Sequence, residues 1–361
     1  MSATWRLLDT GLRRAAENIA LNRALLEAHQ AGEAPHTLRF LRFRPSALIG
    51  FHQSPRQELH LDACARAGIE VQRRITGGGA IYFDEGQLGW ELYLDRRTLG
   101  TADMGAIARR ICEAAAAGIR RLGVDARFRP RNDIEVDGRK LSGTGGAFDG
   151  DSFLYQGTLL LDFDVERMLR VLRIPAEKLS GKAVAGARDR VVSLRELLGE
   201  VPPLETVQRH LAEAFAEAFG VTLEPGGLNA AEEARYREAL AEIDTPEWVH
   251  LRDAPADEAP LLEGVHRARG GLIRAIVWLD EARDHVKQVL ITGDFFVQPR
   301  RLVADLEAAL KDVPRAELRA RVEAFFRERE AALLMLEPAD FAAALETALA
   351  SQTTTDEAAR P

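Results

Sequence analysis

The chain has 361 residues, 46% of them hydrophobic and 29% charged, which is typical of a soluble globular protein of about two domains. Its net charge of −8 disfavours a general nucleic-acid-binding protein, because neutralising phosphates requires a basic surface. We expect no membrane association, because no apolar run reaches about eighteen residues. Only two cysteines occur, Cys64 and Cys112, and the N-terminus lacks the apolar run of a secretion signal. These features exclude a disulfide framework and indicate a cytoplasmic protein.

Hydrophobic alternation predicts strands, and apolar residues three or four positions apart predict helices. In the first half of the chain we expect strands over 36–43, 47–51, 69–75, 80–84 and 88–94, and helices over 15–30, 61–68 and 103–122. The arginines of segment 38–44 predict a solvated strand face. Asp137-Gly138 predicts the tight turn of a hairpin over 133–143, because such turns require positive φ angles. We then expect a glycine-rich loop over 143–151, a strand over 153–164, and helices over 165–172 and 204–219.

A change in composition marks a joint over residues 245–260, which hold three prolines and several acids. After it we expect strands and then helices, over 263–269, 272–279, 286–291, 300–311 and 314–334. The predicted fold class is therefore α/β (α+β), with a mixed-sheet domain over 1–245 and a small α+β domain over 246–340. The polar residues 351–361 predict a disordered tail.

The sharpest local motif is Arg73-Arg74 followed by three glycines, Gly77–Gly79. Glycines allow the backbone to approach a ligand closely and present its N–H groups, and paired guanidinium groups suit phosphate or carboxylate. The alternative is a glycine-rich turn between strands with a solvated basic pair. The motif is neither a Walker loop nor a dinucleotide fingerprint, because it lacks the Gly-Lys-Ser/Thr sequence and the GxGxxG spacing.

A second motif contains Asn132, Asp133 and Lys140 on the predicted hairpin. The chain has only five lysines among its 48 basic residues, so a lysine inside a motif suggests a need for the amine itself. The Lys140 ammonium could hold a phosphate or polarise a carbonyl, and Asp133 could bind a metal. An exposed hairpin charge for Lys140 and a turn cap for Asp133 are equally open interpretations.

Several motifs occur in the order seen in lipoate–protein ligases: RRITGGGAIYFD (73–84), RNDIEVDGRKLSGTGGAF (131–148), YQGTLLLDFD (155–164) and ARDRVVSL (187–194). The segments WRLLDTGLRRAAENIALNRALLE and ALIGFHQSP also look like this family, so the resemblance covers most of residues 5–220. Residues 260–335, with ITGDFF, resemble the family's small C-terminal accessory domain.

The resemblance implies a fold shared with biotin ligases and an ATP-dependent, Mg²⁺-assisted reaction. Lipoate or a similar medium-chain acid would be converted to an acyl-adenylate and transferred to a lysine of a lipoyl carrier protein. The implied catalytic residues are Lys140 and Arg73, and Asp133 would bind the metal. The implied ATP contacts are Arg73, Arg74, Gly78, Gly79, Ala80, Ile81, Tyr82, Asn132, Asp133 and Lys140. Lipoate would contact Arg73, Gly78, Lys140, Gly143 and Thr144.

Two positions depart from the family pattern, because Phe83 and Gln156 stand where family members usually carry histidine. Two alternatives remain open. One is an octanoyl or lipoyl transferase that uses a cysteine thiolate, which the expected core positions of Cys64 and Cys112 disfavour. The other is a non-catalytic protein that binds lipoyl carriers or the free acid. Biotin ligation is disfavoured because the GRGR-type motif of biotin ligases is absent.

Overall fold

The computed structural model describes residues 3–101, 103–130, 132–173, 186, 188–254 and 262–358, and the chain divides into two compact units. Unit 1 comprises Met1–Leu48, Leu59–Arg73 and Ile81–Val249. Unit 2 comprises Ile49–Glu58, Arg74–Ala80 and His250–Pro361. Two short segments from the first quarter of the chain therefore belong to the C-terminal unit, and one of them holds the three consecutive glycines.

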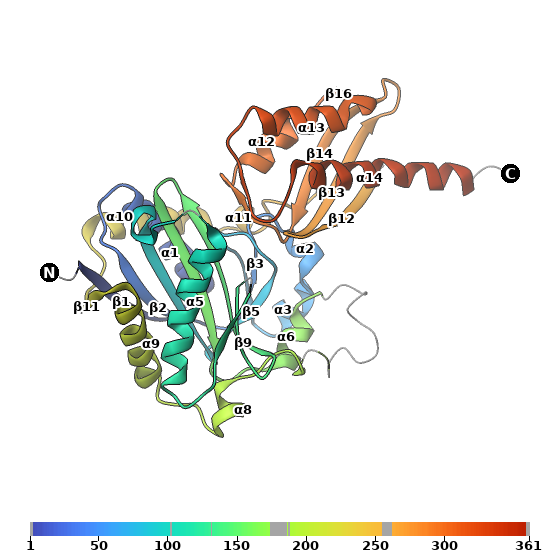
Figure 1. The fold of residues 1–361 in the computed structure, drawn as a ribbon. Coiled ribbons are helices and arrows are strands. Elements are labelled where there is room, and N and C mark those ends of the chain that lie inside the picture. The colour runs from blue at the N-terminus through green and yellow to red at the C-terminus, as the bar shows by residue number, and fades with distance from the viewer. Residues whose placement is uncertain are drawn as a thin grey trace. The chain divides into compact units, whose positions relative to one another are not determined.

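The main sheet of unit 1 has eight strands in the order β11-β1-β2-β6-β10-β9-β8-β7 (Figure 1). Strand β1 pairs in parallel with both of its neighbours, β11 and β2. Every other pair of neighbours, from β2 and β6 to β8 and β7, is antiparallel, so the sheet is mixed. The strands are β1 (Ala3–Arg13), β2 (Thr37–Phe43), β6 (Gln87–Asp95), β7 (Arg127–Arg129), β8 (Asp133–Val136), β9 (Arg139–Asp149), β10 (Ser152–Leu160) and β11 (Val221–Pro225). A smaller sheet has the order β4 (Glu70–Arg73), β3 (Ser46–Ile49) and β5 (Ile81–Phe83).

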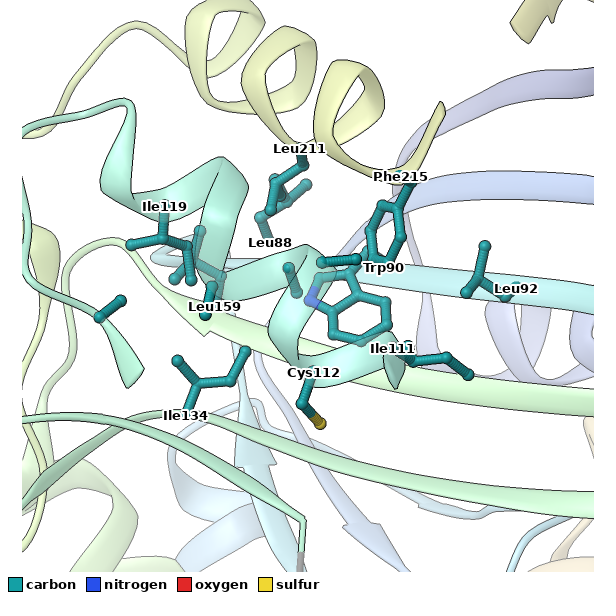
Figure 2. Close-up of a cluster of buried hydrophobic side chains, with 14 of the residues drawn as sticks. Leu88, Trp90, Leu92, Ile111, Cys112, Ile119, Ile134, Leu159, Leu211 and Phe215 are labelled. Atoms are coloured by element: carbon teal, nitrogen blue, oxygen red, sulfur yellow. The ribbon is translucent and has the colours of Figure 1, made fainter. Parts of the chain in front are cut away.

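Helices cover both faces of this sheet because side chains alternate along its strands. On β6, Leu88, Trp90 and Leu92 join a core that is completed by α5 (Met104–Arg120) and α9 (Leu204–Phe219), as Figure 2 shows. The intervening residues Glu91 and Tyr93 instead contact α1 (Ala15–Gln30). Helix α10 (Ala230–Ile243) packs on α1. The short helices are α3 (Leu61–Arg66), α4 (Arg96–Leu99), α6 (Val165–Val171), α8 (Leu194–Leu198) and α11 (Pro246–Val249).

Unit 2 has its own antiparallel sheet, with the order β12 (Leu262–Ala268), β13 (Gly271–Asp280), β14 (His285–Gly293) and β16 (Val313–Pro314). A two-stranded ribbon pairs β15 (Val297–Gln298) with β17 (Ala332–Leu333). The helices are α2 (Pro55–Glu58), α12 (Leu302–Ala309), α13 (Leu318–Arg327) and α14 (Pro338–Ala358), and a 3-10 turn spans Arg315–Glu317. The sheet and the three longer helices enclose a second apolar core.

The predicted α/β (α+β) fold class is confirmed, and most elements lie within a few residues of their predicted bounds. Two predictions were wrong. The expected loop over 143–151 is strand as far as Asp149, because β9 pairs in register with β10 through its glycines. The expected helix over 314–334 is shortened to α13. Helix α14 extends to Ala358, and a disordered tail over 351–361 stays a prediction. The rest of that tail, 359–361, lies outside the described residues.

Candidate functional site

Lys140 lies at the start of β9, directly after the hairpin turn. Asp137 and Gly138 form that turn with φ angles of 49° and 77°, which confirms the predicted hairpin. The Lys140 backbone is held on its other edge, because its N–H donates to the Arg190 carbonyl at 2.8 Å and its carbonyl accepts from the Val192 N–H at 2.9 Å. The backbone is therefore fixed on both edges, whereas the side chain remains 39% exposed.

The Lys140 ammonium folds back over the hairpin and pairs with Asp133, with 2.8 Å between Nζ and Oδ1. The other Asp133 oxygen accepts from Arg129 at 2.6 Å. This fold-back requires a glycine at position 143, because a Cβ there would lie 2.6 Å from Lys140 Nζ. Arg129 also pairs with Glu135 at 3.2 Å, so two cations and two carboxylates meet here. The predicted residues Asp133, Lys140 and Gly143 thus lie together in one corner of unit 1.

Asn132 and Thr144 link the two hairpin strands directly. The Asn132 Nδ2 donates to the Thr144 carbonyl at 2.5 Å, and Thr144 donates from both N and Oγ1 to the Asn132 carbonyl, at 2.9 and 2.8 Å. The Thr144 hydroxyl also lies 2.7 Å from the Tyr155 hydroxyl. The structure therefore uses Asn132 and Thr144 to set the hairpin geometry around Asp133. Arg131, the first residue of this motif, lies outside the described residues.

Cys112 lies beside this motif, which its position in the sequence did not indicate. Its sulfur is 3.4 Å from Thr144 Oγ1 and 3.5 Å from the Tyr155 hydroxyl. The expected core position is nevertheless correct, because both Cys112 and Cys64 are buried. Burial raises the pKa of each thiol, which lowers its thiolate fraction and hence its nucleophilicity.

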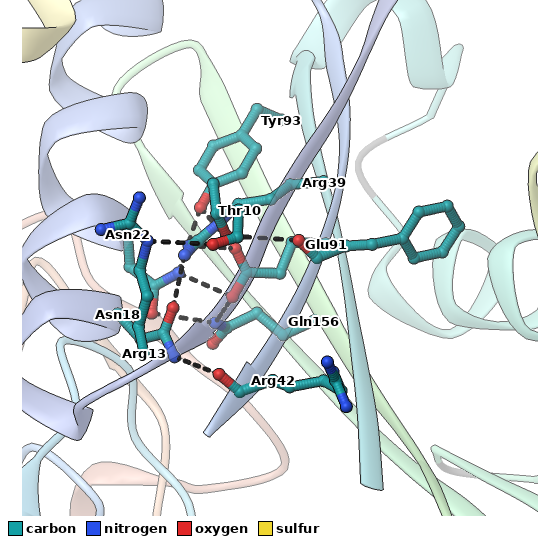
Figure 3. A network of polar contacts seen from close by, with 10 residues as sticks. Thr10, Arg13, Asn18, Asn22, Arg39, Arg42, Glu91, Tyr93 and Gln156 are labelled. Carbon is teal, nitrogen blue, oxygen red and sulfur yellow. Dashed lines mark hydrogen bonds and ion pairs between the residues drawn. The ribbon is translucent and has the colours of Figure 1, made fainter. Parts of the chain in front are cut away.

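A buried polar network lies on the opposite, α1-facing side of the sheet (Figure 3). Its centre is the ion pair between Arg39 and Glu91, at 3.0 Å, with side chains only 0% and 3% exposed. Glu91 also accepts from Asn22 at 2.6 Å and from Gln156 at 2.7 Å. The expectation that the arginines around position 39 form a solvated strand face was therefore wrong for Arg39.

Gln156 is half-buried and pairs with Gly145 across β10 and β9. Gly145 and Gly143 are two residues apart on β9, so both lie on the sheet face that carries Gln156. At Gly143 and Gly145 this face of β9 carries no side chain of its own, and we call these two positions the glycine floor. The Thr158 hydroxyl of β10 lies 3.4 Å from the Gly143 nitrogen. The missing Cβ atoms allow a ligand to approach this part of the backbone closely.

The triple-glycine segment belongs to unit 2 and forms a compact turn. Arg74 organises it, because one guanidinium nitrogen donates to the carbonyls of Gly77 and Gly79, at 3.1 and 2.9 Å. Gly78 has a φ angle of +91°, a conformation that favours glycine. Burial lowers the pKa of Arg74 to about 10, so the guanidinium stays charged at neutral pH.

Arg73 is fully buried in unit 1 and bonds to protein groups. Its guanidinium donates to the carbonyls of Trp248 and Val249 at 2.9 and 2.7 Å, and the Trp248 indole donates to the Arg73 carbonyl at 3.0 Å. These bonds tie the end of β4 to α11. A phosphate contact would require the Arg73 guanidinium to exchange these carbonyls for phosphate oxygens.

The remaining predicted ATP contacts follow the triple-glycine turn. Ala80 and Ile81 are half-buried, and Tyr82 is buried on β5, where it pairs with Ala47 of β3. Phe83, which replaces the family histidine, is buried against the Phe43 ring at 4.6 Å between centroids. A phenyl ring at this position therefore serves packing.

Among the residues that the structure describes, no three His, Cys, Asp or Glu side chains gather as a ready-made metal cluster. Asp133 is the one predicted metal ligand, and Mg²⁺ in nucleotide sites is commonly held by one or two carboxylates together with phosphate oxygens. The described helices also include none with the length and apolarity needed to cross a membrane.

Comparison with known proteins identifies the family. A family model described as the lipoyl protein ligase A/B catalytic domain matches residues 14–216. The octanoyltransferase LipM of Kyrpidia tusciae is 34% identical over 271 residues, which cover 68% of this chain and 98% of that protein. Lipoate-protein ligase A subunit 1 of Thermoplasma acidophilum is 28% identical over 242 residues, which cover 64% of this chain and 90% of that protein.

Solved structures agree with this assignment. The crystal structure of lipoate-protein ligase A bound with ATP is 26% identical, with a TM-score of 0.60, and the match covers 69% of this chain and 99% of that one. P. falciparum LipL1 in complex with lipoate shares the fold over 91% of this chain and 95% of its own, with a TM-score of 0.72 at 18% identity. Because the family model matches more than half of its residues, the chain belongs to the lipoyl protein ligase A/B family.

Proposed function

We propose that this protein is an ATP-dependent ligase that attaches lipoate, or a similar medium-chain acid, to a lysine of a lipoyl carrier protein. The observation that carries the proposal is the contrast between the amine of Lys140 and the two thiols. Lys140 is partly exposed over a glycine floor, whereas both cysteines are buried with raised thiol pKa values. This combination suits a reaction that stabilises charge and needs no enzyme nucleophile.

In the proposed reaction, a carboxylate oxygen of the acid attacks the α-phosphorus of ATP and pyrophosphate leaves. The carrier's lysine amine then attacks the acyl carbon, AMP leaves, and an amide forms after loss of a proton. Lys140 would stabilise the negative charge on the phosphate and the acyl carboxyl group during these steps. The bare backbone at Gly143 and Gly145 would support the acyl group.

Asp133 fits the proposed metal role in its chemistry, because a carboxylate oxygen is a ligand that Mg²⁺ prefers. Its two oxygens bond to Lys140 and Arg129 in this structure. When Lys140 turns toward a phosphate, one Asp133 oxygen is released, and it would then hold Mg²⁺ together with the nucleotide. The metal would supply charge neutralisation on the phosphates. We place this reaction in the cytoplasm, where free thiols such as Cys64 and Cys112 stay reduced.

The deciding experiment is the lipoate-dependent exchange of labelled pyrophosphate into ATP, repeated with octanoate. We expect exchange with the unaltered protein and with a variant carrying both C64A and C112A. We expect K140M to lose most of it while folding normally, as judged by circular dichroism. No exchange with any medium-chain acid would refute the ligase proposal.

An octanoyl or lipoyl transferase is the second candidate, because several similar proteins are named octanoyltransferases. Cys112, which touches Thr144 and Tyr155, would be its nucleophile. In that case octanoyl transfer between carrier proteins would proceed without ATP, and C112S would abolish it while C64S would not. Transfer that requires ATP and survives in C112S would exclude this candidate.

A further inference from the structure

The Asp294–Phe296 turn, which follows β14, packs on the triple-glycine turn within unit 2. The Gly78 N–H donates a hydrogen bond to the Phe295 carbonyl, with 3.4 Å between nitrogen and oxygen. A Cβ on Gly77 would lie 2.4 Å from that same carbonyl oxygen, and one on Gly78 would lie 2.9 Å from the Phe296 ring. Gly77 and Gly78 therefore lack side chains where the C-terminal segment of the chain presses against them.

The other side of the triple-glycine turn is also covered by unit 2. The Arg74 guanidinium bonds to the carbonyls of Gly77 and Gly79, and it would lie 3.4 Å from a Cβ on Gly78. Gly50 packs against the same turn so closely that its own Cβ would come within 1.9 Å of the Gly78 carbonyl oxygen. Gly78 is thus enclosed by a phenyl ring, a guanidinium group and a neighbouring backbone.

The Asp294–Phe296 turn is itself held firmly. The Phe295 ring is fully buried and stacks on His52 with 5.0 Å between centroids. An Asp294 carboxylate oxygen accepts from the Leu272 N–H of β13. Arg300 donates to the Ile75 carbonyl at 3.2 Å, which ties residues just after β15 to the start of the triple-glycine turn. Because both contacting segments are fixed, the contact between them restrains the glycine turn.

We propose that Phe296 is a positioning residue for the triple-glycine turn, holding that turn in the conformation that receives the triphosphate of ATP. This inference rests on the proposed ligase function. It extends that function, because the proposal assigns no role to Phe296. A phenyl ring offers no donor to a phosphate, so Phe296 acts through the backbone that it supports. Three glycines alone would sample many conformations, and the ring and Arg74 remove most of that freedom.

The test compares F296A with F296L, which keeps most of the apolar volume, and with V265A, which shortens a side chain exposed on β12 of the same unit. In pyrophosphate exchange, we expect F296A to raise the KM for ATP roughly ten- to a hundred-fold, since small misplacements of a binding element have effects of this size. F296L should recover part of the loss, and V265A should behave as the unaltered protein. An unchanged KM for ATP in F296A would overturn the inference.

Two further measurements separate this role from others. Inorganic tripolyphosphate carries no base, so its inhibition of exchange should weaken in F296A as much as ATP binding does. Inhibition unchanged by F296A would mean that the ring acts on the base, which would refute the positioning role. Hydrogen exchange of the peptide covering 74–80 should be faster in F296A than in the unaltered protein, whatever the activity. Equal rates of hydrogen exchange in F296A and the unaltered protein would overturn the inference. Absence of pyrophosphate exchange in the unaltered protein would overturn only the proposed function.

Discussion

His29, near the end of α1, and His36, directly before β2, form a chain of hydrogen bonds in unit 1. His29 Nδ1 lies 2.6 Å from the Ser152 hydroxyl, and His29 Nε2 lies 2.9 Å from His36 Nδ1. His36 Nε2 in turn lies 3.1 Å from the Thr98 hydroxyl. Burial lowers the pKa of His29 to about 4, and it lowers the pKa of His36 as well. Both imidazoles are therefore neutral in the folded protein at neutral pH.

This pair predicts a loss of stability in mild acid. An unfolded imidazole takes up a proton below a pH of about 6.5, whereas folded His29 does so only near pH 4, so lowering the pH favours the unfolded state across that window. The free energy of unfolding can be measured with denaturant at several pH values. We expect the contribution of His29 to lower it by up to about 3 kcal/mol between pH 6.5 and pH 4. In H29Q the decrease between pH 6.5 and 4 should be smaller. Parallel curves for the two proteins would contradict the assignment.

At the same scale, residue type alone did not predict the surroundings of single side chains. Arg39 lies on a strand rich in arginines, but its partner Glu91 comes from a strand about fifty residues later in the chain. Likewise, Cys112 lies far from Thr144 in sequence and touches it only because α5 packs on β9 and β10. No local pattern records such pairings, whereas the positions of Lys140 and Asp133 on one hairpin were predicted because a two-residue turn brings them together.

At the scale of the element, the β8–β9 hairpin contains two glycines that are required for different physical reasons. Gly138 needs its positive φ of 77° but has open space around its Cβ position, whereas Gly143 is needed because the Lys140 ammonium occupies the space that a Cβ would fill. Substituting alanine at each position therefore tests different properties of the same hairpin.

We expect G143A to displace Lys140 from Asp133 and to lower pyrophosphate exchange roughly tenfold or more, because the added methyl group occupies the backbone surface where the acyl group would lie. The stability of G143A should change little, since the far end of a flexible side chain can move aside. G138A should show the reverse, losing about 1 kcal/mol of stability through backbone strain while keeping its activity. Exchange assays and thermal unfolding of both variants decide the matter, and a fully active G143A would contradict our account.

Local periodicity predicted most elements because their apolar spacing is clear, as for α1, α5 and α9. It missed β1 and α10, because β1 breaks its alternation at Gly11 and α10 carries charged residues over much of its surface. It also predicted a loop at Gly143–Gly146, since glycine usually interrupts strands. The register with β10 overrides that tendency, so the glycines lie within β9.

At the scale of the whole molecule, two separate apolar cores predict two separate unfolding events. Gly264 of β12 provides a selective probe, because a Cβ there would lie 2.2 Å from the Ala348 nitrogen and 2.4 Å from the Ala344 carbonyl oxygen of α14. Backbone atoms of a helix cannot turn aside as a side chain can. G264A should therefore destabilise unit 2 by roughly 1–3 kcal/mol, the usual cost of overpacking.

Hydrogen exchange in increasing urea, read by mass spectrometry, would follow peptides of the two units separately. We expect peptides of β12, β13 and α14 to exchange at lower urea in G264A, with those of β6 and α5 unchanged. The matched control is G227A, since the Cβ position of Gly227 has no neighbour within 4 Å. A uniform shift of all peptides would show that the chain unfolds as one cooperative body.

The parallel pair of β1 and β11 has a consequence for anyone who shortens this protein. The family match ends at residue 216, but β11, at Val221–Pro225, covers the outer edge of β1. A fragment cut at the end of that match would leave one edge of β1 unpaired over Ala3–Leu7, while β2 still pairs with the other edge. An unpaired strand edge is a site at which copies of a chain can aggregate. Such a fragment should precipitate where one cut after β11 stays dispersed.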